Sequence, residues 1–209
     1  MWDPSLILDT LFRVGLGRVK PAAQMMARAF LDDPLYVHLF PQVEQRLAVL
    51  PPILEHRIWC GVLNGEVYAT SQRLEGVAVW MHTSSDGESL WQMLRAGGFT
   101  LFLKVGGPIV RRLYSLEAHT STVRARLMQR PHWYLSPIAV DPEVQGRGNA
   151  RLLLKPMLQR LDRERLSCFL ATTNRRNVNI YQRYGFALAH ESTIPGTPLR
   201  LWAMIRERA

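Results

Sequence analysis

The sequence predicts the α/β class, with a mixed central sheet flanked by helices. Two observations support this class. Strand-like apolar runs alternate with segments of helical periodicity in the second half of the chain, and the chain ends in two consecutive strand-like runs. No internal repeat, low-complexity tract or linker composition divides the 209 residues, so we expect one domain over residues 1–209.

The first half of the chain is predicted to contain two helices, two strands and a further helical stretch, over residues 19–34, 43–62, 66–71, 76–82 and 88–130. Pro34 is expected to end the first helix. Pro51 and Pro52 either begin or interrupt the second. The last stretch is expected to break at its paired glycines, 97–98 and 106–107.

The second half is predicted as strand, helix, strand, helix and two final strands, over residues 132–140, 147–163, 168–172, 177–185, 186–192 and 199–205. Gly185 is expected to end the last helix. Pro137 lies inside the first of these strands and has no N–H, so it weakens the hydrogen-bond ladder there. We therefore expect backbone groups near Pro137 to be released from the neighbouring strand and open to an amide-bearing ligand. The alternative is an ordinary proline of an edge strand.

The composition is that of an ordinary globular protein, with 47% hydrophobic and 21% charged residues. Lys and Arg total 26 and the formal net charge is +9, which suits an anionic ligand. The arginines are scattered along the chain, which disfavours a nucleic-acid partner. Cys60 and Cys168 are far apart and have no CxxC partner, so they are interpreted as reduced core thiols.

The sequence also disfavours export and membrane insertion. Asp3 and Asp9 stand where a signal peptide would be basic and then apolar. The most apolar stretch, residues 97–110, is short and is interrupted by Lys104 and Pro108. We expect a cytoplasmic protein with no membrane partner.

A glycine-containing turn, Gln145-Gly146-Arg147-Gly148-Asn149-Ala150, follows the strand that ends at Val140 and matches Q/R-x-x-G-x-G/A at every fixed position. N–H groups at a helix start lack internal partners and lie at the positive end of the helix dipole, so they bind anions. Gly146 and Gly148 remove the Cβ atoms that would keep a pyrophosphate away, and Arg147 and Arg151 can add charge. Taken alone, the hexapeptide is also compatible with a helix cap that binds nothing.

Two other phosphate-binding patterns do not fit this turn. A phosphate loop needs Lys and Ser or Thr after the last glycine, and the chain has Asn149 and Ala150 there. A dinucleotide fingerprint needs glycine at position 151, where the chain has Arg151.

The passages WYLSPIAVDPEVQGRGNARLLLKPML and CFLATTNRRNVNIYQRYGFALAHESTIPGTPLRLWAMIR resemble the GNAT superfamily of acyl-CoA-dependent N-acyltransferases, and within it the puromycin N-acetyltransferase-like group. The resemblance is strong over residues 133–206 and weaker at ARAFLDDP, residues 27–34. It implies the GNAT fold with splayed central strands, and acetyl-CoA as co-substrate without a metal. It also implies direct transfer of the acetyl group to a primary amine of a small molecule or peptide in a ternary complex.

The resemblance also assigns roles to individual residues. Those that would bind coenzyme A are Ile138, Ala139, Val140, Gln145, Gly146, Arg147, Gly148, Asn149, Ala150, Arg151, Asn174 and Asn177. Tyr181 aligns with the tyrosine that often serves as general acid, and a phenol with a pKa of about 10 stays protonated at neutral pH. Tyr184, three residues further on, is interpreted as core packing.

The general base is left open. Many relatives of the puromycin-type group have a carboxylate where Ala171 stands, yet the amine must lose a proton before it attacks. The candidates for the base are His82, Glu66, Glu75, Asp86, His132 and ordered water. The alternative to an enzyme is a catalytically inactive module that binds acyl-CoA and has a sensory or regulatory role. The acceptor amine, the acyl chain and the oligomeric state are not specified, with a homodimer as one option.

Overall fold

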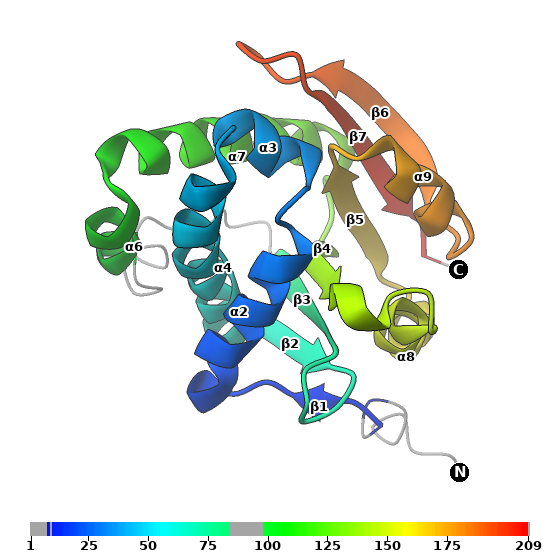
Figure 1. Ribbon diagram of the computed structural model, residues 1–209. Coiled ribbons are helices and arrows are strands. Elements are labelled where there is room, and N and C mark those ends of the chain that lie inside the picture. Colours follow the sequence, from blue (N-terminus) through cyan, green and yellow to red (C-terminus); the bar gives the residue numbers. More distant parts are fainter. Residues whose placement is uncertain (1–7, 9, 84–97, 209) are drawn as a thin grey trace.

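The computed structural model describes Leu8, residues 10–83 and residues 98–208, and these residues form a seven-stranded mixed sheet with helices on both faces (Figure 1). The strands are β1 (Phe12–Arg13), β2 (Gly65–Ala69), β3 (Gly76–Thr83), β4 (His132–Val140), β5 (Ser167–Thr172), β6 (Ala187–Thr193) and β7 (Arg200–Arg206). Their order in the sheet is β1-β2-β3-β4-β5-β7-β6. β4 and β5 are parallel, and all other neighbouring strands are antiparallel. The predicted mixed sheet is confirmed.

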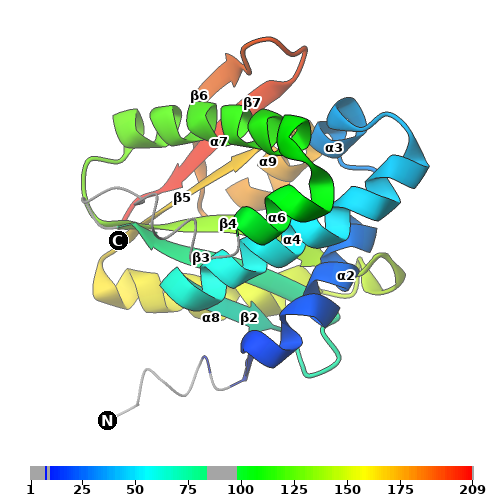
Figure 2. The same ribbon diagram turned by 90° about the vertical axis from the view of Figure 1, so that its left-hand side faces the viewer.

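Helices cover both faces of this sheet. They are η1 (Leu16–Arg18), α2 (Val19–Ala29), α3 (Pro34–Leu39), α4 (Val43–Asn64), α6 (Gly98–Val105), α7 (Gly107–Leu127), η2 (Pro142–Val144), α8 (Asn149–Glu164) and α9 (Arg175–Gln182). Figures 1 and 2 show α2, α4, α6 and α7 on one face and α8 and α9 on the other.

Alternate side chains of β2 and β3 pack against the helices on opposite faces of the sheet. Val67 and Val79 pack with α2 and α4, whereas their neighbours Tyr68 and Trp80 pack with α8, because successive strand side chains point to opposite faces. Gly61 of α4 lies directly on the sheet. A Cβ atom there would be 2.4 Å from Cγ1 of Val79, so only glycine permits this close approach.

Three features of the helical half differ from the sequence-based expectation. Pro34 does not simply end a helix, because it is the first residue of α3 and Asp33 is the N-cap. α4 continues from Val43 to Asn64 through both prolines, Pro51 and Pro52. The short strand β1 was not expected. The break at Gly106 is confirmed by its φ of +85° between α6 and α7, and the part of the predicted helix over residues 88–97 lies outside the described residues.

The central strands separate in the middle of the sheet. β4 pairs with β5 only through His132, Trp133 and Tyr134, although it continues to pair with β3 as far as Val140. Beyond Tyr134, the side of β4 that faces β5 therefore has no strand partner in the described chain. The predicted release of the strand near Pro137 is confirmed, and it occurs on the β5 side.

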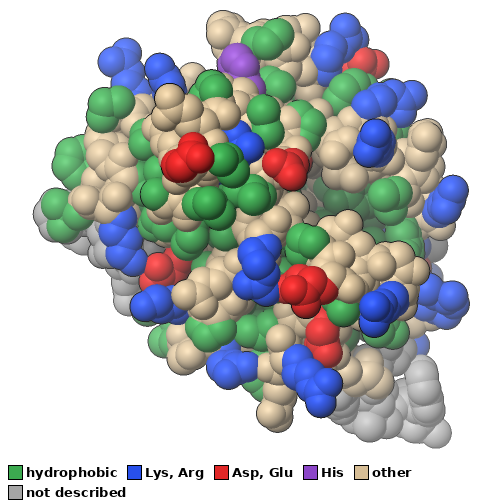
Figure 3. All heavy atoms as spheres, viewed as in Figure 1, with side chains coloured by type: hydrophobic (Ala, Val, Ile, Leu, Met, Phe, Trp, Pro, Cys, Tyr) green, Lys and Arg blue, Asp and Glu red, His purple; other side chains and the backbone are tan. Residues whose placement is uncertain are grey.

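Two further observations concern the distribution of basic side chains on the surface and the apolar character of the helices. Lys and Arg side chains are spread over the face shown in Figure 3 instead of forming one cluster. Among the residues that the structure describes, no helix combines the length and the apolar character needed to cross a membrane.

Candidate active site

The turn between β4 and α8 is held in shape by its own side chains. The side-chain amide of Gln145 donates to the backbone oxygen of Val140 at 3.1 Å, and that of Asn149 donates to the backbone oxygen of Val144 at 3.1 Å. Asp141 accepts a hydrogen bond from the N–H of Glu143 at 3.2 Å. The sequence of the turn thus supplies the side chains whose hydrogen bonds stabilise its backbone.

The same turn presents backbone donors that have no partner. In the described chain, no hydrogen bond uses the N–H groups of Gly148, Asn149 and Ala150, and the first amide of α8 with an acceptor is that of Arg151, 2.9 Å from the oxygen of Gly148. Gly146 and Gly148 have φ values of +77° and +86°, and a Cβ atom on either would meet nothing within 4 Å. The space in front of these amides is open, which fits the binding of a phosphate group.

The charge near these amides is positive. Arg147 and Arg151 are both exposed. The exposed Arg28 of α2 forms an ion pair with the mostly buried Asp141, which ties α2 to the end of β4. The residues predicted to bind a pyrophosphate therefore lie together, and their backbone geometry suits an anion.

A cavity of about 1260 Å³ begins where β4 and β5 separate and extends beneath α4 and α7. Its walls include residues 135–138 of β4, residues 171–173 at the end of β5, and Asn177 and Tyr181 of α9. Ile138 lines the cavity, whereas the side chain of Ala139 is buried in the core between the sheet and α2 and α4.

Tyr181 lies half-buried in this cavity and packs edge-on against Phe186 with ring centroids 5.9 Å apart. Burial raises the pKa of the Tyr181 phenol, and the carboxylate of Asp33 raises it further. Tyr181 is therefore protonated at neutral pH, as predicted, and it is a weaker acid than an exposed tyrosine. Tyr184 packs against the core cluster beside α8 and does not line the cavity.

The two candidate asparagines have different environments. The side chain of Asn174 caps α9 by accepting a hydrogen bond from the N–H of Arg176 at 3.1 Å. Asn177 lines the cavity, and its side-chain amide donates to Oγ1 of Thr172 at 3.3 Å. The side chain of Asn177 is thus part of the cavity wall, whereas Asn174 stabilises the start of the helix.

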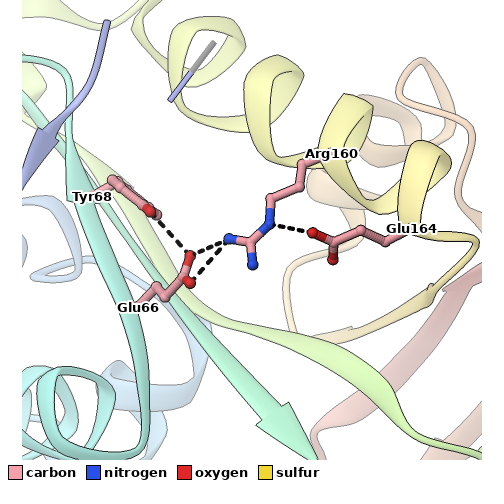
Figure 4. Close-up of polar contacts among 4 residues, drawn as sticks. All are labelled: Glu66, Tyr68, Arg160 and Glu164. Atoms are coloured by element: carbon pink, nitrogen blue, oxygen red, sulfur yellow. Dashed lines mark hydrogen bonds and ion pairs between the residues drawn. The ribbon is translucent and has the colours of Figure 1, made fainter. Parts of the chain in front are cut away.

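Two of the carboxylates considered as general base lie away from the cavity. Glu66 of β2 accepts two hydrogen bonds from Arg160 of α8, at 2.7 and 2.9 Å, on the opposite face of the sheet (Figure 4). Glu75 accepts hydrogen bonds from Ser71 at 2.6 Å and from Thr70 at 3.2 Å. Both carboxylates serve local structure. Asp86 lies outside the described residues.

Both histidines considered as general base line the cavity. His132 is buried and its Nδ1–H donates to the oxygen of Arg130 at 2.8 Å. Burial lowers the pKa of His132, so the ring is neutral at physiological pH. His82 is exposed and contacts the Trp133 ring edge-on, with centroids 5.3 Å apart.

Asp33, which was not among the candidates predicted from the sequence, is a carboxylate that lines the cavity on the side of Tyr181. It accepts a hydrogen bond from the N–H of Leu35 at 3.0 Å as the N-cap of α3. Burial raises the pKa of Asp33 despite its backbone hydrogen bonds, and none of the ion pairs in the described chain includes it. The Asp-Pro pair was a usable signal, because Asp before Pro is typical of a helix start.

A second missed carboxylate, Glu117 of α7, forms an ion pair with Arg57 of α4 inside the same cavity. Burial opposes ionisation of Glu117, but the charge and hydrogen bond of Arg57, with a contribution from Arg124, hold its pKa below the ordinary value. No sequence pattern connects these residues, because they meet only through the packing of two helices. Within the described ranges, no group of three His, Cys, Asp or Glu side chains is arranged to hold a metal ion.

The chain is similar to known acetyltransferases. A model described as the acetyltransferase (GNAT) family matches residues 76–186. An uncharacterised N-acetyltransferase of Schizosaccharomyces pombe is 27% identical over 180 residues, covering 83% of this chain and 72% of that protein.

Solved structures of acetyltransferases share the fold. A structure from Corynebacterium glutamicum, described as histone acetyltransferase HPA2 and related acetyltransferase, has a TM-score of 0.65 at 21% identity, covering 96% of both chains. A putative arylalkylamine N-acetyltransferase of the yellow fever mosquito has a TM-score of 0.65 at 16% identity, covering 94% of this chain and 86% of that one. A polyamine N-acetyltransferase of Drosophila melanogaster has a TM-score of 0.57 at 16% identity, covering 94% and 98%. The expected fold is confirmed.

Proposed function

The chain belongs to the GNAT family of acetyltransferases, and we propose that it transfers an acetyl group from acetyl-CoA to a primary amine of a small molecule or peptide. The observation that carries this proposal is the continuity between two features. The unpartnered amides of Gly148 to Ala150 lie just beyond the end of β4, and the cavity that holds Tyr181 begins along the same strand. A long ligand with a diphosphate at one end and a thioester at the other fits this arrangement.

Coenzyme A would be held at three places. The diphosphate would bind the amides that open α8 and the arginines beside them, Arg147 and Arg151. The pantetheine amides would pair with the free side of β4 near residues 138–140, as an added strand would. The thioester would then lie in the cavity near Asn177 and Tyr181. Acetyl-CoA supplies an activated acyl group and a thiolate as leaving group.

In this proposal Asp33 accepts a proton from the acceptor amine, and Tyr181 donates a hydrogen bond to the leaving sulfur. An ammonium ion cannot attack a thioester, so a proton must leave the acceptor. Asp33 has a raised pKa and no cationic partner among the described residues, and it is therefore suited to hold the ammonium and take its proton. Tyr181 donates a hydrogen bond to the departing sulfur. Because its pKa is raised, the phenol stays protonated and stabilises the developing thiolate as a hydrogen-bond donor.

A direct assay tests the proposal. The protein is incubated with acetyl-CoA and a panel of primary amines, and free thiol is measured. Thiol release that depends on both the protein and an amine is the expected result. Binding of coenzyme A without amine-dependent thiol release across the panel would identify a sensory or regulatory module instead. Neither a cytoplasmic location nor a homodimer follows from these contacts, and both stay predictions.

A further inference from the structure

Arg57 and Glu117 place a hydrogen-bond donor and an acceptor side by side in the cavity. Arg57 of α4 donates through Nη2 to Oε2 of Glu117 on α7. The two side chains keep 36% and 21% of their surface exposed, and both line the cavity. In the described chain neither side chain makes another hydrogen bond. The remaining N–H groups of Arg57 and Oε1 of Glu117 are therefore open to a ligand.

Both members of this pair are charged, and the aromatic hydroxyls beside them are neutral. The negative charge of Glu117 raises the pKa of Arg57, although burial opposes this shift. Burial raises the pKa values of Tyr36 and Tyr134 to about 12. The ion pair thus brings no net charge of its own into the cavity.

The surroundings of the pair combine apolar and aromatic side chains with the guanidinium group of Arg124, which also acts on Glu117. Ile53 of α4 and Leu113 and Leu116 of α7 line the same cavity, together with Tyr36 and Tyr134. In such surroundings, binding is weakened if the bound ligand leaves a buried polar atom of the protein without a hydrogen-bond partner. The ligand is therefore expected to match both open positions at once.

Charge decides which ligand group matches. An ammonium group near Glu117 would be repelled by Arg57, and a carboxylate near Arg57 would be repelled by Glu117. A neutral amide satisfies both, because its C=O accepts from Arg57 and its N–H donates to Glu117. We propose, on the basis of the acetyltransferase function above, that the acceptor is an amine with an amide in its body and that Arg57 and Glu117 bind this amide.

The size of the cavity agrees with an acceptor larger than a simple amine. Sites for drug-sized ligands have volumes of about 300–1,000 Å³, and this cavity measures about 1260 Å³. It has room for an amide-bearing acceptor in addition to the end of a pantetheine arm. An aminoacyl amide or the amino end of a peptide has the required chemistry.

Four acceptors that share a phenylethylamine skeleton test this inference with the full-length protein and acetyl-CoA. They are phenethylamine, phenylalanine, phenylalaninamide and phenylalanylglycinamide. We expect kcat/KM for the better of the two amides to exceed that for phenethylamine by about ten-fold or more, since two hydrogen bonds of ordinary strength are gained, and phenylalanine to be a poor acceptor. Equal or higher kcat/KM for phenethylamine or phenylalanine would overturn the inference and leave the acetyltransferase function standing. No thiol release with any amine would overturn both.

Two double variants test whether Arg57 and Glu117 cause the preference for amide-bearing acceptors. Arg57→Met combined with Glu117→Leu removes both charges together, which avoids an unpaired buried charge. We expect the ratio of kcat/KM between the better amide and phenethylamine to fall to about one-tenth of the wild-type ratio or less. The control, Lys104→Met with Glu55→Leu, removes an ion pair of 2.9 Å between α6 and the same helix α4 and should keep the wild-type ratio.

The single variant Arg57→Lys gives a second test if the double variant does not fold. Lysine keeps the charge but loses the planar fork of donors, so we expect the amide preference to fall while the thermal midpoint stays close to that of the wild type. An unchanged amide preference in a folded variant of either kind contradicts the assignment.

Discussion

The side-chain nitrogen of Gln145 lies 3.1 Å from the backbone oxygen of Val140. This hydrogen bond joins the end of β4 to the turn that opens α8, and the bond from Asn149 to Val144 supports the same turn. The amides of Gly148 to Ala150 are thus held in place by the protein itself. A ligand that binds preorganised donors loses less free energy to ordering them, so this turn is suited to tight binding of a diphosphate.

Replacing Gly148 by Asp should abolish binding of coenzyme A. The new carboxylate would occupy the space in front of the free amides and repel the phosphates. Gly196→Asp is the matched control, because Gly196 also has a positive φ, +75°, and nothing within 4 Å of a Cβ atom, but lies in the turn before β7. Calorimetric titration with coenzyme A should show no binding for the first variant and wild-type affinity for the second. Equal affinities would refute the placement of the diphosphate.

Replacing Tyr181 by Phe should lower kcat on the order of 10²-fold, the size of a typical general-acid contribution. The affinity for coenzyme A should change little, because the ring and its packing against Phe186 are kept. Tyr184→Phe, in the turn that follows α9, serves as the control and should retain turnover. Steady-state rates together with calorimetric affinities decide the matter, and an undiminished kcat for Tyr181→Phe would remove the phenol from the mechanism.

Replacing Asp33 by Asn should reduce kcat/KM by about ten-fold or more, since it removes a charge-assisted contact to the ammonium and the proton acceptor. Asn can still cap α3, so the fold should persist. The neighbouring Asp32, with a side chain that is 88% exposed, gives the control Asp32→Asn, which should behave like the wild type. If Asp33→Asn and Asp32→Asn have the same kcat/KM, Asp33 is not the proton acceptor.

The raised pKa of Asp33 also predicts a pH dependence. The wild-type rate should fall as the pH is lowered through the folded-state pKa of Asp33, which lies above the ordinary value of an aspartate. The contribution of Asp33 to the free energy of unfolding changes with pH in the opposite direction. A raised carboxyl pKa contributes stability below the unfolded-state pKa, and this contribution is lost as the pH rises through the folded-state pKa. The free energy of unfolding of Asp33→Asn should lack this component, which denaturant titrations between acidic and neutral pH would measure.

Replacing Glu66 by Gln should cost stability and leave catalysis unchanged. Arg160 donates to Glu66 and to Glu164, and the hydroxyl of Tyr68 donates to Glu66 at 3.0 Å (Figure 4). We expect the free energy of unfolding to fall by about 1–2 kcal/mol, the lower part of the range for hydrogen bonds to charged groups, because these side chains are partly exposed.

The control for this prediction is a surface ion pair. Glu191 pairs with Arg200 at 2.6 Å, and their side chains are 36% and 54% exposed. Glu191→Gln should change the free energy of unfolding by no more than about 0.5 kcal/mol. A loss of turnover in Glu66→Gln, without a loss of folding, would return Glu66 to the catalytic candidates.

The elements that the sequence predicted well are those with strong local signals. β4 was predicted over residues 132–140 and has those bounds, because an apolar run between polar residues is readily recognised. Gly148 was predicted in the turn before α8 and has the positive φ that favours glycine. A release of β4 from a neighbouring strand was also expected, from the missing N–H of Pro137, and the structure shows it on the β5 side from Leu135 onward.

The residues that we propose to bind the acceptor could not be predicted in the same way. Glu117 and Arg57 come from helices that are distant in sequence, and only the packing of α4 against α7 brings them together. Asp33 had a local signal, but Pro34 was interpreted as the end of one helix and not as the start of the next. Glu66 was one of several candidates for the base that no sequence spacing distinguished, and its partner Arg160 lies 94 positions away.

Amide NMR of the 15N-labelled protein tests the central claim most directly. On titration with coenzyme A, we predict large shifts of the resonances of Gly148, Asn149 and Ala150, because their N–H groups acquire phosphate acceptors, while pantetheine, which lacks the diphosphate, leaves these three nearly unchanged. If coenzyme A binds and these three resonances stay in place while others move, the diphosphate is held elsewhere and the proposed placement of acetyl-CoA is wrong.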